Sequence, residues 1–357
     1  MDSAPLNITS FGKALHLNGQ RLYVWYRDVL SHYSENKGRC IHENDIKIKK
    51  NGKEETIEVP VFREDNFGAN MAIDEKQIGR DFYTIMSNRE SGKLAMVSQT
   101  MKYEELELIF NAHPTMSGKV KTLTRDFSKL YKKVGNEIFR ESIQIGDKFH
   151  AIKNLMDAHQ SIRIRYRQKE LERKRISFNE FKGKEQKRKQ ECNQAKIEYK
   201  KKKFYYEEEK HRNGETSLEL LARSRYLLYK YESQWSESQK KRAKILFRLY
   251  PEIEKAYQLS CEFRDFMSRD NIGKNYLLLN KRLYKWFEKV EESQISEMLN
   301  FQSMVEINEE YIMNYFIDGA TNALAEGLNS KIQKFISSNN GTRDKDFFFF
   351  RLANYYA

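Results

Sequence analysis

ANMAIDEKQIGRDFYTIMSNRESGKLAMVSQT, residues 69–100, decides the fold, because turn-forming residues separate its short apolar runs. ANMAID at 69–74 predicts a buried strand that ends in Asp74, and DFYTIMSN at 81–88 predicts a second strand. The turn NRESGK leads into LAMVSQT at 94–100, which predicts a third. The three runs therefore predict an antiparallel meander.

The segment that follows predicts helical crossovers in the same sheet. YEELELIFNA at 103–112 and SKLYKKVGNEIF at 128–139 have helical periodicity, whereas VKTLT at 120–124 and SIQIG at 142–146 predict strands. A right-handed helical crossover brings the fourth strand back parallel to the first. The fold class is therefore expected to be α/β with a mixed five-stranded sheet, an arrangement that resembles the ribonuclease-H-like fold of nucleases and polynucleotidyl transferases.

Two carboxylates far apart in sequence are expected to meet at one edge of this sheet. Asp74 ends the first strand and Asp126 follows the fourth, and the carboxyl ends of adjacent parallel strands lie side by side. A single aspartate at a strand end is usually a turn former, but the pairing of two favours a metal site. Asp147 follows the fifth strand, and His150 either lies near the site or simply begins the next helix.

The segments on either side are less regular. Residues 1–67 predict a short N-terminal region, with an amphipathic helix within 11–35 and short strands or an extended linker within 40–66. Residues 161–310 have helical periodicity throughout and predict an all-helical basic domain. A dense Lys/Arg/Glu run at 163–212 predicts a long solvated helix or a helical hairpin, and Pro251 is expected to break or restart a helix.

One part of the basic run combines positive charge with aromatic rings. Four lysines, Lys200, Lys201, Lys202 and Lys203, directly precede Phe204, Tyr205 and Tyr206. Such a combination can bind phosphates and stack on bases, although a solvated helical face is the more usual structure for a charge run. Trp235 and Trp286 are interpreted as core anchors of the helices.

The composition favours a polyanionic partner. The chain has 357 residues, a formal net charge of +13 and a sequence pI near 9.3, and nucleic acid is the leading polyanion. Many basic proteins bind no DNA, so charge alone decides nothing. Three widely spaced cysteines form no metal-binding pair, and no stretch is apolar enough to span a membrane, so a cytoplasmic protein is expected.

A third carboxylate is expected to complete the metal site. Hydrolysis and strand joining at phosphorus can use two Mg²⁺ ions, which prefer carboxylate ligands. Glu326 lies in a predicted helix with an apolar stripe, and Thr321 or Asn322 is the candidate N-cap. The stripe consists of Leu324, Leu328, Ile332 and Phe335. The small neighbours of Glu326, Ala325 and Gly327, would permit close approach to the sheet.

Four motifs occur in a fixed order along the chain. They are AIDEKQ at 72–77, RDFSKLY at 125–131, GDKFHAIKNLMDA at 146–158 and TNALAEGLNSKIQKF at 321–335. In this combination the chain resembles bacterial insertion-sequence transposases of the ISL3 group, from about residue 68 to the C-terminus. GTRDKDFFFFRLANYY at 341–356 follows the pattern of one subgroup, in which a separate protein carries the N-terminal region.

The resemblance implies a DDE transposase that cleaves DNA at transposon ends and joins the ends to target DNA. It implies a metal-binding catalytic triad of Asp74, Asp126 and Glu326, with two Mg²⁺ or Mn²⁺ ions as cofactors. The catalytic domain would comprise 68–160 and 311–357, interrupted by the helical domain 161–310. Asp147 and His150 match the family's DxFH motif and are expected to lie close to the metal ligands.

The resemblance also implies partners. Double-stranded DNA is expected to contact Lys200–Lys203, Asn329 and Lys331, with a homodimer or larger assembly on DNA and association with the bacterial nucleoid. Relatives usually carry an arginine where this chain has Asp318-Gly319-Ala320, and many carry an N-terminal zinc ribbon and helix-turn-helix that are not visible here. A companion protein for the N-terminal region is one expectation, and an inactive copy is the other.

Two further functions remain open from the sequence. A nuclease of the same fold would hydrolyse DNA without joining it, and a decayed transposase would bind DNA without catalysis. The separation of the three carboxylates distinguishes the catalytic hypotheses from the decayed one.

Overall fold

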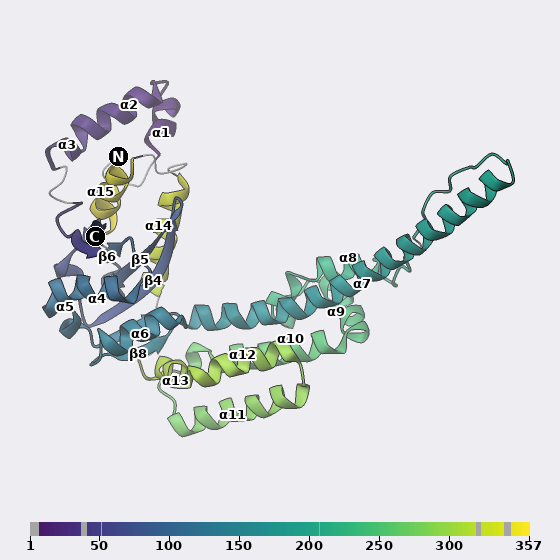
Figure 1. Cartoon of the computed structure of the whole chain (residues 1–357). Coiled ribbons are helices and arrows are strands. Elements are labelled where there is room, and N and C mark those ends of the chain that lie inside the picture. Colours follow the sequence, from purple (N-terminus) through teal and green to yellow (C-terminus); the bar gives the residue numbers. More distant parts are fainter. Residues whose placement is uncertain (1–6, 37–40, 51, 207, 319–322, 339–343) are drawn as a thin grey trace. The chain divides into compact units, whose positions relative to one another are not determined.

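The computed structural model describes residues 7–36, 41–50, 52–206, 208–318, 323–338 and 344–357. The side chains of 36, 50, 318 and 323–326 lie outside this description. The chain divides into two compact units (Figure 1). Unit 1 comprises Met1–His150 and Asn308–Ala357, and unit 2 comprises Ala151–Ile307.

Unit 1 contains a mixed sheet of six strands in the order β3-β6-β5-β4-β7-β8. The strands are β3 (Val61–Phe62), β4 (Asn70–Ile78), β5 (Asp81–Asn88), β6 (Leu94–Ser98), β7 (Thr122–Arg125) and β8 (Ile143–Gly146). The five predicted strands are all present, and β4, β7 and β8 are parallel as the crossover argument required. The expected number is wrong, because the two-residue strand β3 pairs antiparallel with β6.

The first long strand extends further than predicted. Asp74 does not end β4, which continues to Ile78 because the residues after Asp74 pair with β5. Its parallel pairing with β7 covers only Asn70–Ala72. Asp74 therefore lies just past the parallel part of β4, inside the β4–β5 hairpin.

Each face of the sheet packs against its own helices. One core joins Ile73 and Leu123 to the helices α4 (Tyr103–Ala112), α5 (Pro114–Lys119) and α6 (Lys129–Glu137). The other joins Ile85 and Val97 to the C-terminal helices α14 (Ala323–Ser338) and α15 (Lys345–Tyr356). Because successive strand residues point to opposite faces, two apolar layers cover the sheet and leave its carboxyl edge for polar groups.

The N-terminal segment differs from the single helix expected within 11–35. It forms α1 (Ile8–Ala14), α2 (Gly19–Trp25), the π-helix η1 (Tyr26–Leu30) and α3 (Tyr33–Asn36). His16 has a φ of 57°, and Asn18 caps α2 by accepting from the N–H groups of Gln20 and Arg21. This cap and turn break the helical periodicity. The strands β1 (Ile46–Lys50) and β2 (Lys53–Ile57) follow as an antiparallel pair.

Unit 2 consists of helices in the residues that the structure describes. They are the main part of α7 (Lys148–Gln194), then α8 (Ser217–Arg223), α9 (Glu237–Leu249), α10 (Pro251–Phe266), α11 (Tyr276–Ser293) and α12 (Ser296–Ile307). α13 (Glu309–Asp318) returns the chain to unit 1. As predicted, Pro251 begins a new helix, since its ring fits the first helical turn.

The end of the long basic run was predicted incorrectly. α7 is a single long helix, but it stops at Gln194, and residues 197–206 return along it without helix or strand (Figure 1). Lys196, with a φ of 56°, lies at the turn. The expected helix to residue 212, or a second helix of a hairpin, is therefore absent from this described segment.

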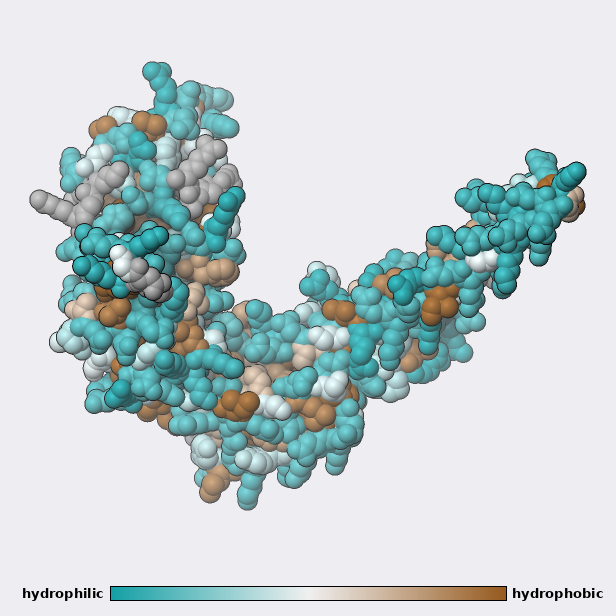
Figure 2. Space-filling view, in the orientation of Figure 1, coloured by the Kyte–Doolittle hydropathy of each residue, from teal (hydrophilic) through white to brown (hydrophobic). Residues whose placement is uncertain are grey.

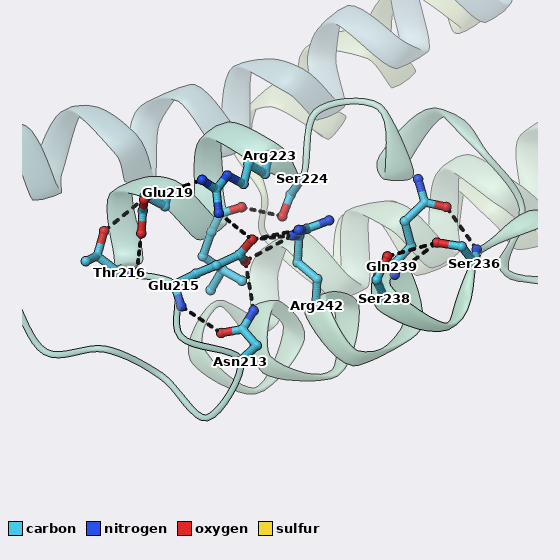
Figure 3. A network of polar contacts seen from close by, with 11 residues as sticks. Asn213, Glu215, Thr216, Glu219, Arg223, Ser224, Ser236, Ser238, Gln239 and Arg242 are labelled. Carbon is cyan, nitrogen blue, oxygen red and sulfur yellow. Dashed lines mark hydrogen bonds and ion pairs between the residues drawn. The ribbon is translucent and has the colours of Figure 1, made fainter.

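A buried ion pair organises the start of the remaining helices (Figure 3). The Glu215 carboxylate is only 4% exposed and accepts hydrogen bonds from Arg242, Arg223 and Asn213. These bonds lower the pKa of Glu215, with Arg242 contributing most. Three donors thereby satisfy a carboxylate that burial alone would destabilise.

The two tryptophans predicted as core anchors are buried. The indole N–H of Trp235 donates to the Leu227 carbonyl at 2.8 Å, and that of Trp286 donates to the Leu259 carbonyl at 2.9 Å. Both indoles therefore have a partner for their polar atom, as buried tryptophans require. None of the described helices is long and apolar enough to cross a bilayer.

Candidate active site

Three aspartates lie at matched positions on the three adjacent parallel strands of unit 1. Ala72 pairs with Thr124 in the β4–β7 ladder, and Asp74 and Asp126 each follow these partners by two positions (72 to 74, 124 to 126). Arg125 pairs with Gly146 in the β7–β8 ladder, and Asp126 and Asp147 each follow by one. Because parallel strands carry equivalent residues side by side, the three carboxylates gather at one edge of the sheet.

Asp74 is partly buried and held by three groups. Its Oδ1 accepts from the Glu75 N–H at 2.8 Å, its Oδ2 accepts from Asn329 Nδ2 at 2.9 Å, and Lys76 Nζ lies 3.6 Å from Oδ2. Burial raises the pKa of the Asp74 carboxyl, while Lys76 and His150 oppose that shift. Burial thus disfavours the charged form, and a bound cation would favour it.

Asp126 begins the turn into α6. Its Oδ1 accepts from the Ser128 N–H at 2.9 Å, and the Ser128 hydroxyl in turn caps α6 by accepting from the Tyr131 N–H. The fully buried Arg125 donates to the Asp126 carbonyl at 2.8 Å and lies over the Tyr311 ring at 4.2 Å. Backbone and cap together fix the direction of the Asp126 side chain.

Asp147 and His150 form the start of α7. Asp147 Oδ1 accepts from the Phe149 N–H at 2.8 Å, and Asp147 Oδ2 lies 3.1 Å from His150 Nδ1. The hydrogen bond with Asp147 is the main cause that raises the pKa of His150, and the charges of Asp74 and Asp126 raise it further, against burial. His150 is therefore within electrostatic reach of all three aspartates.

The helix predicted to carry the third carboxylate packs on the sheet. Leu328, Ile332 and Phe335 of α14 are buried in the core, as the apolar stripe predicted. The side chain of Glu326 lies outside the described residues, and so do the cap candidates Thr321 and Asn322. Glu326 precedes Asn329 by three positions on α14, a spacing that places both on one face of the helix.

The contact between Asn329 and Asp74 was missed by sequence reasoning, which assigned Asn329 to DNA. Its amide Nδ2 is donated to Asp74, and its Oδ1 is buried without a hydrogen-bond partner among the described atoms. The spacing of three from Glu326 was the available signal. Lys331 is exposed on the same helix.

The described residues do not by themselves complete a metal site. No three of their histidine, cysteine, aspartate or glutamate side chains converge closely enough to hold an ion. Their chemistry nevertheless fits a hard cation, because Asp74 is desolvated and the buried Asn329 Oδ1 lacks a donor. Asp74 and Asp126 would hold the ion, together with a third oxygen ligand.

The predicted DNA-binding lysines belong to unit 2. Lys200, Lys201, Lys202 and Lys203 are all exposed on the segment that returns along α7. Phe204 packs against Phe178 and Phe181 of α7, at ring-centroid distances of 5.0 and 5.3 Å. The lysines are therefore presented from an extended segment fixed by an aromatic contact, and not from a helix as expected.

Comparison with known proteins identifies the family. No curated protein and no solved structure matches the chain. A family model described as a transposase, of the ISL3 group of DDE enzymes, matches residues 71–352. The six-stranded mixed sheet and the large helical region that follows it are consistent with the ribonuclease-H-like fold of such enzymes. The chain therefore belongs to the ISL3 family of DDE transposases, enzymes that cleave DNA and transfer its strands.

Proposed function

We propose that Asp74, Asp126 and Glu326 form the catalytic triad of this transposase. The matched register of Asp74 and Asp126 on β4 and β7 carries the proposal, because it brings two acids 52 positions apart (126 − 74) to the same point of the sheet edge. Glu326 would approach from α14, whose residue Asn329 contacts Asp74. The ribonuclease-H-like part would comprise 68–160 and 311–357, with 161–310 inserted between the second and third acids.

The proposed reaction is hydrolysis of a phosphodiester at the transposon end, followed by attack of the freed 3′-hydroxyl on target DNA. Two Mg²⁺ or Mn²⁺ ions, when bound, would activate the nucleophile and neutralise charge on the leaving oxygen. Asp74 and Asp126 would share one ion, and Glu326 would complete the second site. Neither step leaves DNA covalently attached to the protein.

Asp147 and His150 are proposed to position this arrangement. Asp147 accepts from the Phe149 N–H at the start of α7 and holds the His150 ring. His150 feels the charges of Asp74 and Asp126. A cationic imidazole beside the carboxylates would limit their mutual repulsion before ions and DNA arrive.

DNA is proposed to contact both units through exposed cations. Lys331 lies on the helix that carries Asn329, and Lys200–Lys203 supply four positive charges on unit 2. Asn329 keeps its proposed DNA contact only through an oxygen, since its Nδ2 is donated to Asp74. A protein with net charge +13 should bind double-stranded transposon ends and target DNA more weakly as salt rises. A homodimer on paired ends and a companion protein for the N-terminal region are part of the proposal.

A cleavage and joining assay tests the function. Purified protein is incubated with labelled transposon ends, target DNA and Mg²⁺, and the expected products are nicked ends and joined strands. Glu326→Gln should abolish both products while the affinity for DNA stays unchanged. Hydrolysis without joining would identify a nuclease, and wild-type cleavage by Glu326→Gln would remove this glutamate from the triad.

A further inference from the structure

The far end of α7 carries a groove with an aromatic floor. α7 and the returning segment enclose a volume of about 810 Å³, and the rings of Phe178, Phe181 and Phe204 line it. Phe178 and Phe204 lie 5.0 Å apart with their planes at 70°, so neither ring fully covers the other. Phe178 remains 37% exposed, which leaves an aromatic face open to a ligand.

Lysines surround this floor. Lys182, Lys189, Lys201, Lys202 and Lys203 line the groove, and none of the five forms an ion pair with a described residue. Lys182 Nζ lies 4.7 Å from the centroid of the Phe178 ring. The end of α7 appears in Figure 2 as a hydrophilic surface with small hydrophobic areas. The groove therefore combines uncompensated positive charge with apolar faces.

The single acid that lines the groove already has partners. The Glu185 carboxylate accepts from the Tyr199 hydroxyl at 2.6 Å and from the Lys202 N–H at 3.2 Å, and it forms an ion pair with Arg188 at 3.2 Å. Arg188 also donates to the Lys200 carbonyl. These contacts hold the returning segment against α7 and leave the lysine side chains directed to other partners.

A purely structural role explains only part of this arrangement. A small apolar cluster that fixes the returning segment needs the ring of Phe204 and the contacts of Glu185, which are present. It does not need five lysines without acidic partners, because such a cluster repels itself. Their mutual repulsion is relieved by a polyanion, and the open face of Phe178 selects a polyanion with flat apolar groups.

We propose that this groove binds an unpaired segment of DNA, with a base on the Phe178 face and flanking phosphates on the lysines. Stacking on aromatic rings requires a base whose face is free, which a paired base inside a duplex does not offer. Duplex DNA would use the lysines alone. The inference rests on the proposed function for the source of the strand, because cleavage at a transposon end releases a free end that can unpair.

The test compares single-stranded and duplex DNA. Binding of the full chain to a fluorescein-labelled single-stranded oligonucleotide, and to its duplex, is measured by anisotropy for wild type and Phe178→Leu. Leucine keeps apolar volume against Phe204 but lacks a stacking face. The single-strand Kd should rise about 5-fold or more, the scale of one lost base stack, and the duplex Kd should stay within about twofold. Phe82→Leu, at a position 50% exposed on β5, is the matched control.

Charge is tested with two triple variants that lose the same net charge. Lys201→Gln, Lys202→Gln and Lys203→Gln together should weaken single-strand binding more than Lys241→Gln, Lys281→Gln and Lys285→Gln together, which lie on exposed positions of α9 and α11. Equal losses in the two triples, an unchanged single-strand Kd in Phe178→Leu, or equal losses for both DNA forms would overturn the proposal. Normal cleavage with an unchanged Phe178→Leu Kd refutes the groove alone. Absent wild-type cleavage with the predicted shift refutes the triad alone.

Discussion

Asn329 Nδ2 donates a hydrogen bond of 2.9 Å to Asp74 Oδ2, across 255 positions of the sequence. The bond joins α14, the helix of Glu326, to β4, the strand of the first acid. The buried Leu328 and Ile332 on the same helix hold it against the sheet core. Asn329 thereby fixes the rotation of α14 relative to Asp74, and Glu326 lies one turn before it.

Removal of this bond should weaken metal use more than folding. Asn329→Ala is expected to lower Mg²⁺-dependent cleavage about 10- to 100-fold and to raise the Mg²⁺ concentration needed for half-maximal rate, as loss of an oriented ligand neighbour does. The measurement is a Mg²⁺ titration of the cleavage rate. Ser330→Ala, at the exposed next position, should behave like wild type. An unchanged Mg²⁺ requirement in Asn329→Ala would show that the bond plays no positioning role.

Acid should destabilise unit 2 through His159. This imidazole is fully buried, neither ring nitrogen has a hydrogen-bond partner among the described atoms, and burial lowers its pKa from 6.5 to about 4. Between these values the unfolded chain binds a proton that the folded chain does not, so stability falls with falling pH by about 3 kcal/mol in total. Urea unfolding as a function of pH measures this slope.

His159→Leu supplies the control for the pH slope. Without the imidazole, the part of the slope between pH 6.5 and about 4 that comes from this group should disappear. A slope that persists unchanged in His159→Leu would assign the acid sensitivity to other groups. Glu215 adds a slope of the same sign at lower pH, because its pKa is lowered and its stabilisation is lost as pH falls through that value.

The Glu215 network should be essential to unit 2. Glu215→Ala leaves the buried guanidinium of Arg242 without its carboxylate, and the loss of one partner of a buried pair costs about 3–5 kcal/mol. Thermal unfolding followed by circular dichroism measures it. Glu237→Ala, which removes an exposed pair with Lys240, should cost less than about 1 kcal/mol. Equal effects of the two substitutions would mean that Glu215 is solvated in the folded protein.

Much of the sheet could be predicted because its strands are short apolar runs bounded by turn residues. β3 could not be recognised, since a two-residue strand has no periodicity and forms only through its pairing with β6. Asp74 was placed at a strand end because the polar residues after it read as a turn, whereas pairing with β5 keeps them extended. Pairing partners, not local composition, decided both cases.

The candidate site was predictable in part for the same reason. The right-handed crossover brought Asp74 and Asp126 to one edge without any knowledge of side chains. The apolar stripe placed Leu328, Ile332 and Phe335 in the core, but periodicity cannot name the partner of the polar Asn329. The extended segment after α7 was also missed, because Lys and Glu favour helices and only the turn at Lys196 ends one.

Binding of Mn²⁺ tests most directly whether Asp74 and Asp126 form one cation site. Free Mn²⁺ is followed by electron paramagnetic resonance during titration of wild type, Asp74→Asn, Asp126→Asn and Glu75→Gln, the last removing an exposed carboxylate from the neighbouring position of β4. Asp74→Asn and Asp126→Asn should each lose the same tight site, and Glu75→Gln should retain it. Identical Mn²⁺ binding by all four proteins would contradict a shared site at this sheet edge.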